Sequence, residues 1–209
     1  DASFTESDWI GIKMIYSSVK EVDSLKIGRF GLGFKSVFHI TDHPVVLSGD
    51  RILFMDPHRN PDCVCLTIQL SRLKKWKKFN IDDLFVALDG TFGFSREILK
   101  TGIYNGTLLW FPLRSRASSL SDTVYNKEKV MDLFTLFRSE ASSILVFLKH
   151  LTKVSLHDRK GNTDTINLQF TVEINVDEVR ELREAFLKKI RSLNKSIPYN
   201  SIDCIYHLS

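Results

Sequence analysis

The residues with the clearest chemical potential are three glycines, Gly28, Gly31 and Gly33, which lie directly before an apolar, helix-forming run. Glycine lets the backbone adopt a positive φ and approach a ligand closely. A helix that begins there offers unpaired N–H groups and the positive end of its dipole. Residues 28–35 therefore predict a phosphate-binding element. The competing interpretation is a tight turn that enters a helix without any ligand.

Spacing separates this segment from the two commonest nucleotide motifs. The dinucleotide fingerprint reads G-x-G-x-x-G after a strand, whereas the order here is G-x-x-G-x-G after the charged segment 20–26. A P-loop needs glycine, lysine and serine or threonine in direct succession, but Phe34 separates Gly33 from Lys35. The segment fits neither a Rossmann turn nor a P-loop.

The full string around these glycines resembles one particular family. Residues 28–38, Gly-Arg-Phe-Gly-Leu-Gly-Phe-Lys-Ser-Val-Phe, are similar to the second glycine box of the GHKL (Bergerat-fold) ATPases. Within that group the chain resembles the sacsin and plant No Vein branch, in the segments 4–12, 39–44, 48–50, 56–58 and 106–114. The resemblance to a sacsin repeat extends from about Phe4 to about Leu156, and the remaining residues resemble it loosely.

This resemblance implies an ATP site. In the family the glycine box closes the ATP lid, and a threonine on a strand after the lid helps to anchor adenine. ATP or ADP with Mg²⁺ is the implied cofactor of the intact family domain. Carried onto this sequence, the implied nucleotide-binding residues are Gly28, Arg29, Gly31, Leu32, Gly33, Phe34, Lys35 and Thr107.

The same resemblance implies that this chain is inactive by itself. The family's first helix carries a glutamate that activates water and an asparagine that binds Mg²⁺, and both precede the adenine box. The sequence begins at Asp1, after the place where that helix is expected, and the adenine-box glycines are missing around residues 1–4. We therefore assign no catalytic and no metal-binding residue here. GHKL-type ATPase activity is expected only of an intact parent protein.

Composition sets broader limits on the class of protein. The chain has 209 residues, of which 43% are hydrophobic and 26% charged, which is enough for one sizeable globular core. A net charge of +4 is too small to require a nucleic acid or a membrane as a partner. The cysteines fit neither a disulfide framework nor a C-x-x-C zinc site, so we expect a cytoplasmic location. No apolar run reaches the length of about 18 residues that would predict a membrane span.

Three other groups receive ordinary structural interpretations. The six histidines show no metal-ligand spacing. The segment 56–58, Asp-Pro-His, could suggest acid/base chemistry, but no partner serine can be identified from sequence, so no catalytic role is assigned. The basic cluster Arg72–Lys78 could bind nucleic acid or an acidic protein, although a solvated surface is favoured.

Hydrophobic periodicity and turn residues predict a mixture of elements without strict alternation. Thr5 to Asp8 resembles a capping box that starts the first helix. The mixture indicates an α+β fold, a two-layer α/β sandwich of the Bergerat type, whose mixed and mostly antiparallel sheet carries helices on one face. Helices are expected over 6–19, 33–40, 82–88, 127–150 and from 177, and strands over 45–47, 52–55, 64–70, 108–113, 154–157, 165–173 and 202–208, with 108–113 as a central strand.

Two domain regions and two functions follow. Residues 1–158 are expected to form a partial GHKL domain without its N-terminal helix, and residues 159–209 a strand-helix-strand extension.

The first functional hypothesis is a nucleotide-binding, chaperone-type module of a sacsin-like multidomain protein, with client or co-chaperone proteins as partners. The alternative is a degenerate GHKL scaffold that serves protein-protein interaction without nucleotide. Nucleic-acid binding through residues 72–78 ranks behind both.

Overall fold

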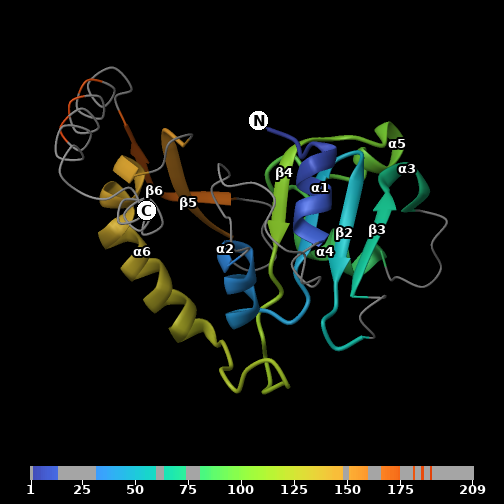
Figure 1. Cartoon of the computed structure of the whole chain (residues 1–209), viewed down its shortest axis with the longest axis horizontal. Helices are drawn as coiled ribbons and strands as arrows, with labels where there is room; N and C mark the ends of the chain where they lie inside the picture. The colour runs from blue at the N-terminus through green and yellow to red at the C-terminus, as the bar shows by residue number, and fades with distance from the viewer. Residues whose placement is uncertain are drawn as a thin grey trace. The chain divides into compact units, whose positions relative to one another are not determined.

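The computed structural model describes most of the chain, which divides into two compact units, Asp1–Asn126 and Lys127–Ser209 (Figure 1). The helix predicted from residue 177 and the strand predicted over 202–208 lie almost wholly outside the described residues. Among the described residues, no helix is long and apolar enough to cross a membrane. The described residues are 2–13, 32–59, 64–73, 81–147, 151–159 and 166–174, with the single positions 181, 185 and 189.

The first unit contains a four-stranded sheet. Its strands are β1 (Val45–Gly49), β2 (Arg51–Met55), β3 (Cys65–Gln69) and β4 (Tyr104–Trp110), in the order β3-β2-β1-β4. Each of the three pairings is antiparallel. The strand predicted over 108–113 is confirmed as β4, but its predicted central place is wrong because β4 lies at one end of the described sheet.

Strand alternation gives the sheet two apolar faces, because successive side chains point to opposite sides. Val46, Leu53 and Met55 form one cluster with the α1 residues Trp9 and Ile12, and the aromatic rings of Phe4, Phe34 and Phe38 pack against this cluster. We call this side the α1 face. It carries helix α1 (Glu6–Lys13), helix α2 (Leu32–Lys35) and the 3₁₀ helix η2 (Ser36–His39).

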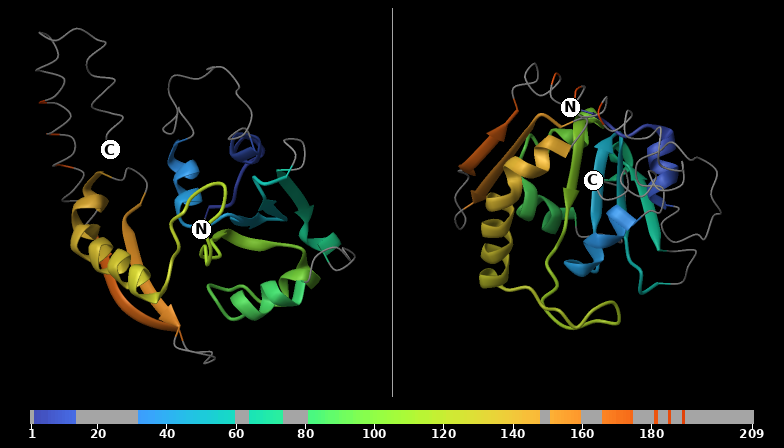
Figure 2. Two further views of the ribbon diagram at one scale, coloured as in Figure 1. Left: turned by 90° about the horizontal axis from the view of Figure 1, so that it is seen from below. Right: turned by 60° about the vertical axis from the view of Figure 1, so that its left-hand side comes forward.

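The opposite face of the sheet is also covered by helices. Val45, Leu47 and Ile52 pack there with residues from α3 (Leu70–Leu73), α4 (Ile81–Leu88) and α5 (Ile98–Thr101). The left view of Figure 2 shows α1 and α2 above the strands and the green helical segment below them. The expectation of helices on one face is therefore wrong for this unit, while the α+β class with antiparallel pairing is confirmed.

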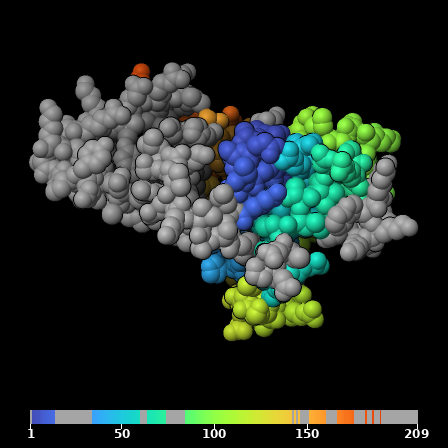
Figure 3. All heavy atoms as spheres, turned by 45° about the vertical axis from the view of Figure 1, so that its right-hand side comes forward, coloured from blue at the N-terminus to red at the C-terminus, as the bar shows by residue number. Residues whose placement is uncertain are grey.

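Helix α1 begins with the predicted capping box. The Thr5 N–H donates to Asp8 Oδ2 at 2.8 Å, and the Asp8 N–H donates to Thr5 Oγ1 at 3.3 Å. These two bonds are the reciprocal side-chain contacts that define a capping box at the start of a helix. Trp9 and Ile12 are buried, as the helical spacing predicts. Figure 3 shows the blue atoms of α1 directly beside the cyan-to-teal atoms of the β2 and β3 region.

The second unit combines a long helix with a β-hairpin. Helix α6 (Lys127–Phe147) packs against β5 (Lys153–Arg159) and β6 (Ile166–Glu173), which pair antiparallel. Leu145 and Ala141 are buried, and the Phe137 ring lies 6.0 Å from the Phe170 ring between centroids. The predicted long helix and both predicted strands are confirmed, although the turn that joins the strands lies outside the described residues.

Candidate functional site

The residues predicted to bind nucleotide fall into three groups. Gly28, Arg29 and Gly31 lie outside the described residues. Leu32, Gly33, Phe34 and Lys35 form α2, where the half-buried Phe34 ring packs into the apolar cluster of the α1 face and Lys35 is exposed. Thr107 lies in β4 and is exposed.

The sheet register brings α2 and Thr107 to the same face. Thr107 pairs with Ser48. Val46, which lies two residues before Ser48 in β1, pairs with Leu109. Side chains two residues apart on a strand share a face. Since Val46 belongs to the cluster that Phe34 and Phe38 cover, Thr107 and Leu109 project from the α1 face. Two segments that the sequence analysis singled out separately are thus positioned on one side of one sheet.

A hydroxyl network surrounds Thr107. Thr107 Oγ1 donates to the Ala2 carbonyl at 2.8 Å and lies 2.8 Å from Ser48 Oγ. Ser48 Oγ accepts the Phe4 N–H at 2.7 Å and lies 3.0 Å from the Gly106 carbonyl oxygen. The network therefore joins residues 2–4, which precede α1, to the neighbouring strands β1 and β4.

A β-bulge in β4 makes this network possible. The register shifts between Ser48, which pairs with Thr107, and Gly49, which pairs with Tyr104. Gly106 lies in the extra segment with a φ of 116°, a backbone conformation that favours glycine. Its N–H donates to Ser3 Oγ at 3.3 Å, so the bulge turns backbone groups of β4 towards the N-terminal segment.

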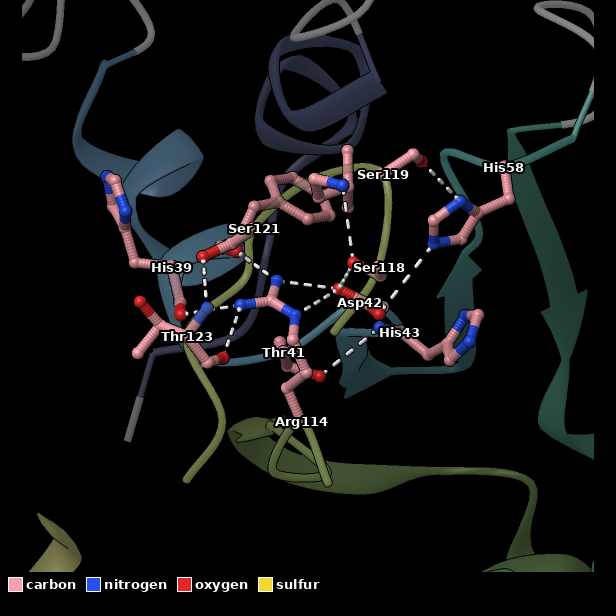
Figure 4. Close-up of polar contacts among 12 residues, drawn as sticks. His39, Thr41, Asp42, His43, His58, Arg114, Ser118, Ser119, Ser121 and Thr123 are labelled. Carbon is pink, nitrogen blue, oxygen red and sulfur yellow. Dashed lines mark hydrogen bonds and ion pairs between the residues drawn. The ribbon is translucent and has the colours of Figure 1, made fainter. Parts of the chain in front are cut away.

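Arg114 holds the carboxyl end of η2. Its guanidinium donates to the Phe38 carbonyl at 2.5 Å and to the His39 carbonyl at 2.9 Å (Figure 4). The Arg114 N–H donates to the Ile40 carbonyl at 2.9 Å. A cation at the end of a helix satisfies carbonyls that have no partner within the helix. Arg114 thereby fixes the segment that follows the glycine box against the chain that leaves β4.

Asp42 balances the charge of Arg114. Asp42 Oδ1 accepts from Arg114 Nε at 2.7 Å and from Ser118 Oγ at 3.1 Å. Burial raises the pKa of Asp42, while the hydrogen bonds from Arg114 and Ser118 lower it, and the net pKa lies below the ordinary value. Because both ions are paired and hydrogen-bonded, the structure tolerates this charge in a largely buried place.

The Sacsin domain family matches residues 1–171 of the chain. The chain belongs to the sacsin family. It is similar to sacsin from Homo sapiens, with 39% identity over 219 residues that cover 100% of this chain and 5% of that protein. The resemblance to a sacsin repeat is therefore confirmed, and the chain spans about 5% of the length of the curated relative that it matches.

Ser119, His58 and Asp42 lie in a row in this sacsin-family chain, which resembles the order of groups in a catalytic triad. Ser119 Oγ lies 3.0 Å from His58 Nδ1, and His58 Nε2 lies 3.7 Å from Asp42 Oδ2. A distance of 3.7 Å is longer than a hydrogen bond, and the carboxylate is already paired with Arg114. Asp42 therefore does not orient His58 as the acid of a catalytic triad would.

The α1 face of this sacsin domain carries hydroxyl groups and exposed lysines, among them Lys13 and Lys35. Thr107 and Ser48 present polar atoms on β4 and β1, and Lys35 follows the glycine box. Within the described residues, no group of three or more histidine, cysteine or acidic side chains could hold a metal ion. The arrangement can hold a polar ligand, and its described side chains provide no nucleophile with an oriented base.

Sequence reasoning missed Ser48, Ser119 and the Asp42–Arg114 pair. Asp42 and Arg114 lie in segments that resemble the family, but nothing in one sequence shows that two distant charged residues meet. Ser48 looks like an ordinary turn residue beside Gly49 and Asp50. The one usable signal was the polar Ser48 directly after the apolar run Val45–Leu47, which placed a hydroxyl at the end of a buried strand.

Proposed function

We propose that this chain is part of a nucleotide-binding, chaperone-type module, and that an adenine nucleotide binds on the α1 face beside Thr107. The observation that carries this proposal is the shared face of α2 and Thr107. The family resemblance assigns the phosphates to residues 28–35 and the base to Thr107, and a ligand that contacts both needs them on one side of the sheet.

The described residues suit an adenine nucleotide in two respects. Thr107 is an exposed residue that carries a hydroxyl group, and Lys35 is an exposed cation that can approach a phosphate. The family's Mg²⁺ ligand belongs to the helix expected before the adenine box, so the described residues do not provide the metal site. When bound, Mg²⁺ would neutralise phosphate charge.

The protein-level proposal follows from the family. A nucleotide-bound state and a nucleotide-free state could differ in their affinity for client or co-chaperone proteins. We place this module in the cytoplasm. The alternative remains a degenerate scaffold, in which the same fold binds protein partners and the glycines serve only the turn.

Calorimetric titration with ADP and ATP in the presence of Mg²⁺ tests the proposal. Thr107→Val should weaken binding because it removes the hydroxyl and keeps the shape of the side chain. Thr135→Val is the matched control, since Thr135 is exposed on α6 and its hydroxyl donates only within its own helix, to the Met131 carbonyl. If the wild type binds nucleotide and Thr107→Val binds it with the same affinity, the ligand lies elsewhere. If the wild type binds no nucleotide, the degenerate scaffold is favoured.

A further inference from the structure

We propose that Ser119 is a phosphorylation site, modified by a protein kinase that selects arginine before its target serine, and that His58 receives the phosphate. The site lies in the irregular segment 111–126, which connects β4 to α6. It does not depend on a nucleotide at the α1 face, so it goes beyond the proposed function.

Ser119 is one of three exposed hydroxyl residues in this segment. The serine and threonine residues of the segment are Ser115, Ser118, Ser119, Ser121 and Thr123. Ser118 is half-buried, and its hydroxyl donates to Asp42 at 3.1 Å and accepts the Leu120 N–H at 3.2 Å. Ser121 is also half-buried, and its oxygen accepts the Thr123 N–H at 3.1 Å. Ser115, Ser119 and Thr123 remain as exposed acceptors for a phosphoryl group.

The neighbouring residues select Ser119 among these three. Arg116 lies three residues before Ser119, and Leu120 follows it directly. Both neighbours are exposed. Kinases distinguish their substrates by charge patterns, and an arginine can form charge-assisted hydrogen bonds with acidic groups of a kinase. Ser115 and Thr123 have an uncharged residue at the corresponding position, so neither offers this cation.

The segment can open locally for a kinase. Residues 111–126 contain no helix and no strand, and Figure 1 shows them as a yellow-green loop. The backbone around Ser119 is held by a short turn, in which the Ser118 N–H donates to the Ser121 carbonyl at 3.1 Å. Exposed loops open at a small cost in free energy compared with strands and helices of the core. A kinase therefore has to open one turn to bind Arg116 and Ser119 in an extended form.

The reaction is an ordinary phosphoryl transfer. ATP, bound by the kinase, supplies the γ-phosphoryl group. A bond forms between Ser119 Oγ and the γ-phosphorus, while the bond from that phosphorus to the β–γ bridging oxygen breaks and ADP leaves. The Ser119 hydroxyl proton passes to a base of the kinase.

His58 is positioned to contact the phosphate. Its Nδ1 lies 3.0 Å from Ser119 Oγ, and Figure 4 shows the two side chains pointing toward one another. The His58 side chain is 32% exposed, which leaves space beside the ring for a phosphate group. A phosphate on Ser119 would thus tie the segment 111–126 to the turn that follows β2.

The charges around His58 favour this contact. Within the described residues, the charged and titratable groups that contact His58 or its direct partners are Asp42, His43, Asp56, Arg59 and Arg114. Each of the two carboxylates is paired with an arginine, at 2.7 Å for Asp42 and 2.9 Å for Asp56. The other two groups are the imidazoles of His43 and His58, whose ring centroids lie 6.0 Å apart. A phosphate that carries nearly two negative charges therefore meets two groups that become positive on protonation.

The first arm of the test is a kinase assay on residues 1–209. Calmodulin-dependent protein kinase II, which selects arginine three residues before its target, is used with ATP and Mg²⁺, and mass spectrometry locates the phosphate. Wild type should carry phosphate on Ser119. Arg116→Ala should lower the rate at this serine at least about tenfold, because it removes a charge-assisted contact with the kinase. Ser115→Ala is the control and should leave the rate at Ser119 unchanged.

The second arm measures the titration of the phosphate by phosphorus NMR. The second pKa of phosphoserine is about 6, and a protonated imidazole in contact favours the dianion. The phosphate of wild type should therefore lose its proton at a pH lower by about half a unit than in His58→Ala. His39→Ala is the control, because Figure 4 places His39 and His58 on opposite sides of Arg114. If His58→Ala does not fold, His58→Gln takes its place, since it keeps a polar side chain without a charge.

The outcomes test both halves of the proposal. Phosphate on other residues but not on Ser119, or no phosphate at all, would overturn it. A rate that Arg116→Ala leaves unchanged would overturn the assigned class of kinase. Equal titration midpoints in wild type and His58→Ala would overturn the role of His58. Thr107→Val should be phosphorylated at the wild-type rate, which separates this site from the proposed nucleotide site.

Discussion

Arg114 and Asp42 form a largely buried ion pair in which the guanidinium Nε lies 2.7 Å from Asp42 Oδ1, although 71 residues separate them in the chain. The side chains are 1% and 15% exposed, respectively. Because the same guanidinium also holds the carbonyls of Phe38 and His39, the pair links the exit of β4 to the helical segment after the glycine box. We expect this link to contribute to the free energy of unfolding.

Arg114→Ala should destabilise the chain by about 3–5 kcal/mol, because it leaves a buried carboxylate without its partner and backbone carbonyls without donors. Arg114→Lys should recover only part of this loss, since an ammonium group cannot reproduce the planar set of donors. Urea unfolding measures both. Arg116→Ala provides the control, because Arg116 is exposed. A loss in Arg114→Ala no greater than in Arg116→Ala would show that the pair contributes little.

Acid should remove the contribution of Asp42 to stability. The folded pKa of Asp42 lies below the ordinary value of 3.8, so between the two values the unfolded state binds more protons. The contribution is therefore complete above the ordinary value and is lost as the pH falls through the folded pKa. The free energy of unfolding, measured from neutral pH down to about pH 2, should fall more steeply for wild type than for Asp42→Asn. Parallel curves would contradict this assignment.

The sequence predicted the parts of the fold that local patterns determine. The continuous apolar runs 45–47 and 52–55 predicted β1 and β2, and Gly49, with a φ of 56°, supports the turn between them. Helices α3 and α5 span four residues each, too few for a 3.6-residue period to be visible. The expectation of helices on one face overlooked one signal, because the runs 45–47 and 52–55 are apolar on both sets of strand residues, which is typical of strands covered on both faces.

The candidate site was predictable only in part, because its residues are brought together by the pairing of distant strands. The glycine box and Thr107 were found by resemblance, because each lies in a recognisable local string. Their shared face depends on the pairing of β1 with β4, a contact between segments far apart in the chain. Ser48 meets Thr107 only through that pairing. Long-range register is the information that a single sequence does not display.

The bulge in β4 gives a third prediction, with a matched pair of glycines. Gly106→Ala should destabilise the chain by about 1–3 kcal/mol, because a side chain is strained at a φ of 116°. Gly11→Ala should stabilise it by about 0.5–1 kcal/mol, because Gly11 lies inside α1 and alanine favours a helix. A Cβ at either position meets nothing within 4 Å, so the contrast isolates the backbone. Chemical unfolding measures both, and equal effects would refute the claim that the bulge requires glycine.

The last prediction concerns hydrolysis. A polypeptide of residues 1–209 should release phosphate from ATP no faster than the background, even with excess Mg²⁺. Phosphoryl transfer depends on positioning, on a metal that neutralises the phosphates and on a residue that orients the attacking water. The glycine segment and Thr107 would hold the nucleotide but perform neither of the last two tasks.

A polypeptide extended upstream, to include the helix with the family's glutamate and asparagine, should bind ADP more tightly and show measurable turnover. Calorimetry and a phosphate-release assay on both polypeptides make the comparison, with Thr107→Val in the extended polypeptide as the control for contaminating ATPases. Turnover by residues 1–209 that Thr107→Val abolishes would show that the catalytic groups lie within this chain, and equal ADP binding by both polypeptides would show that the upstream helix does not complete the site.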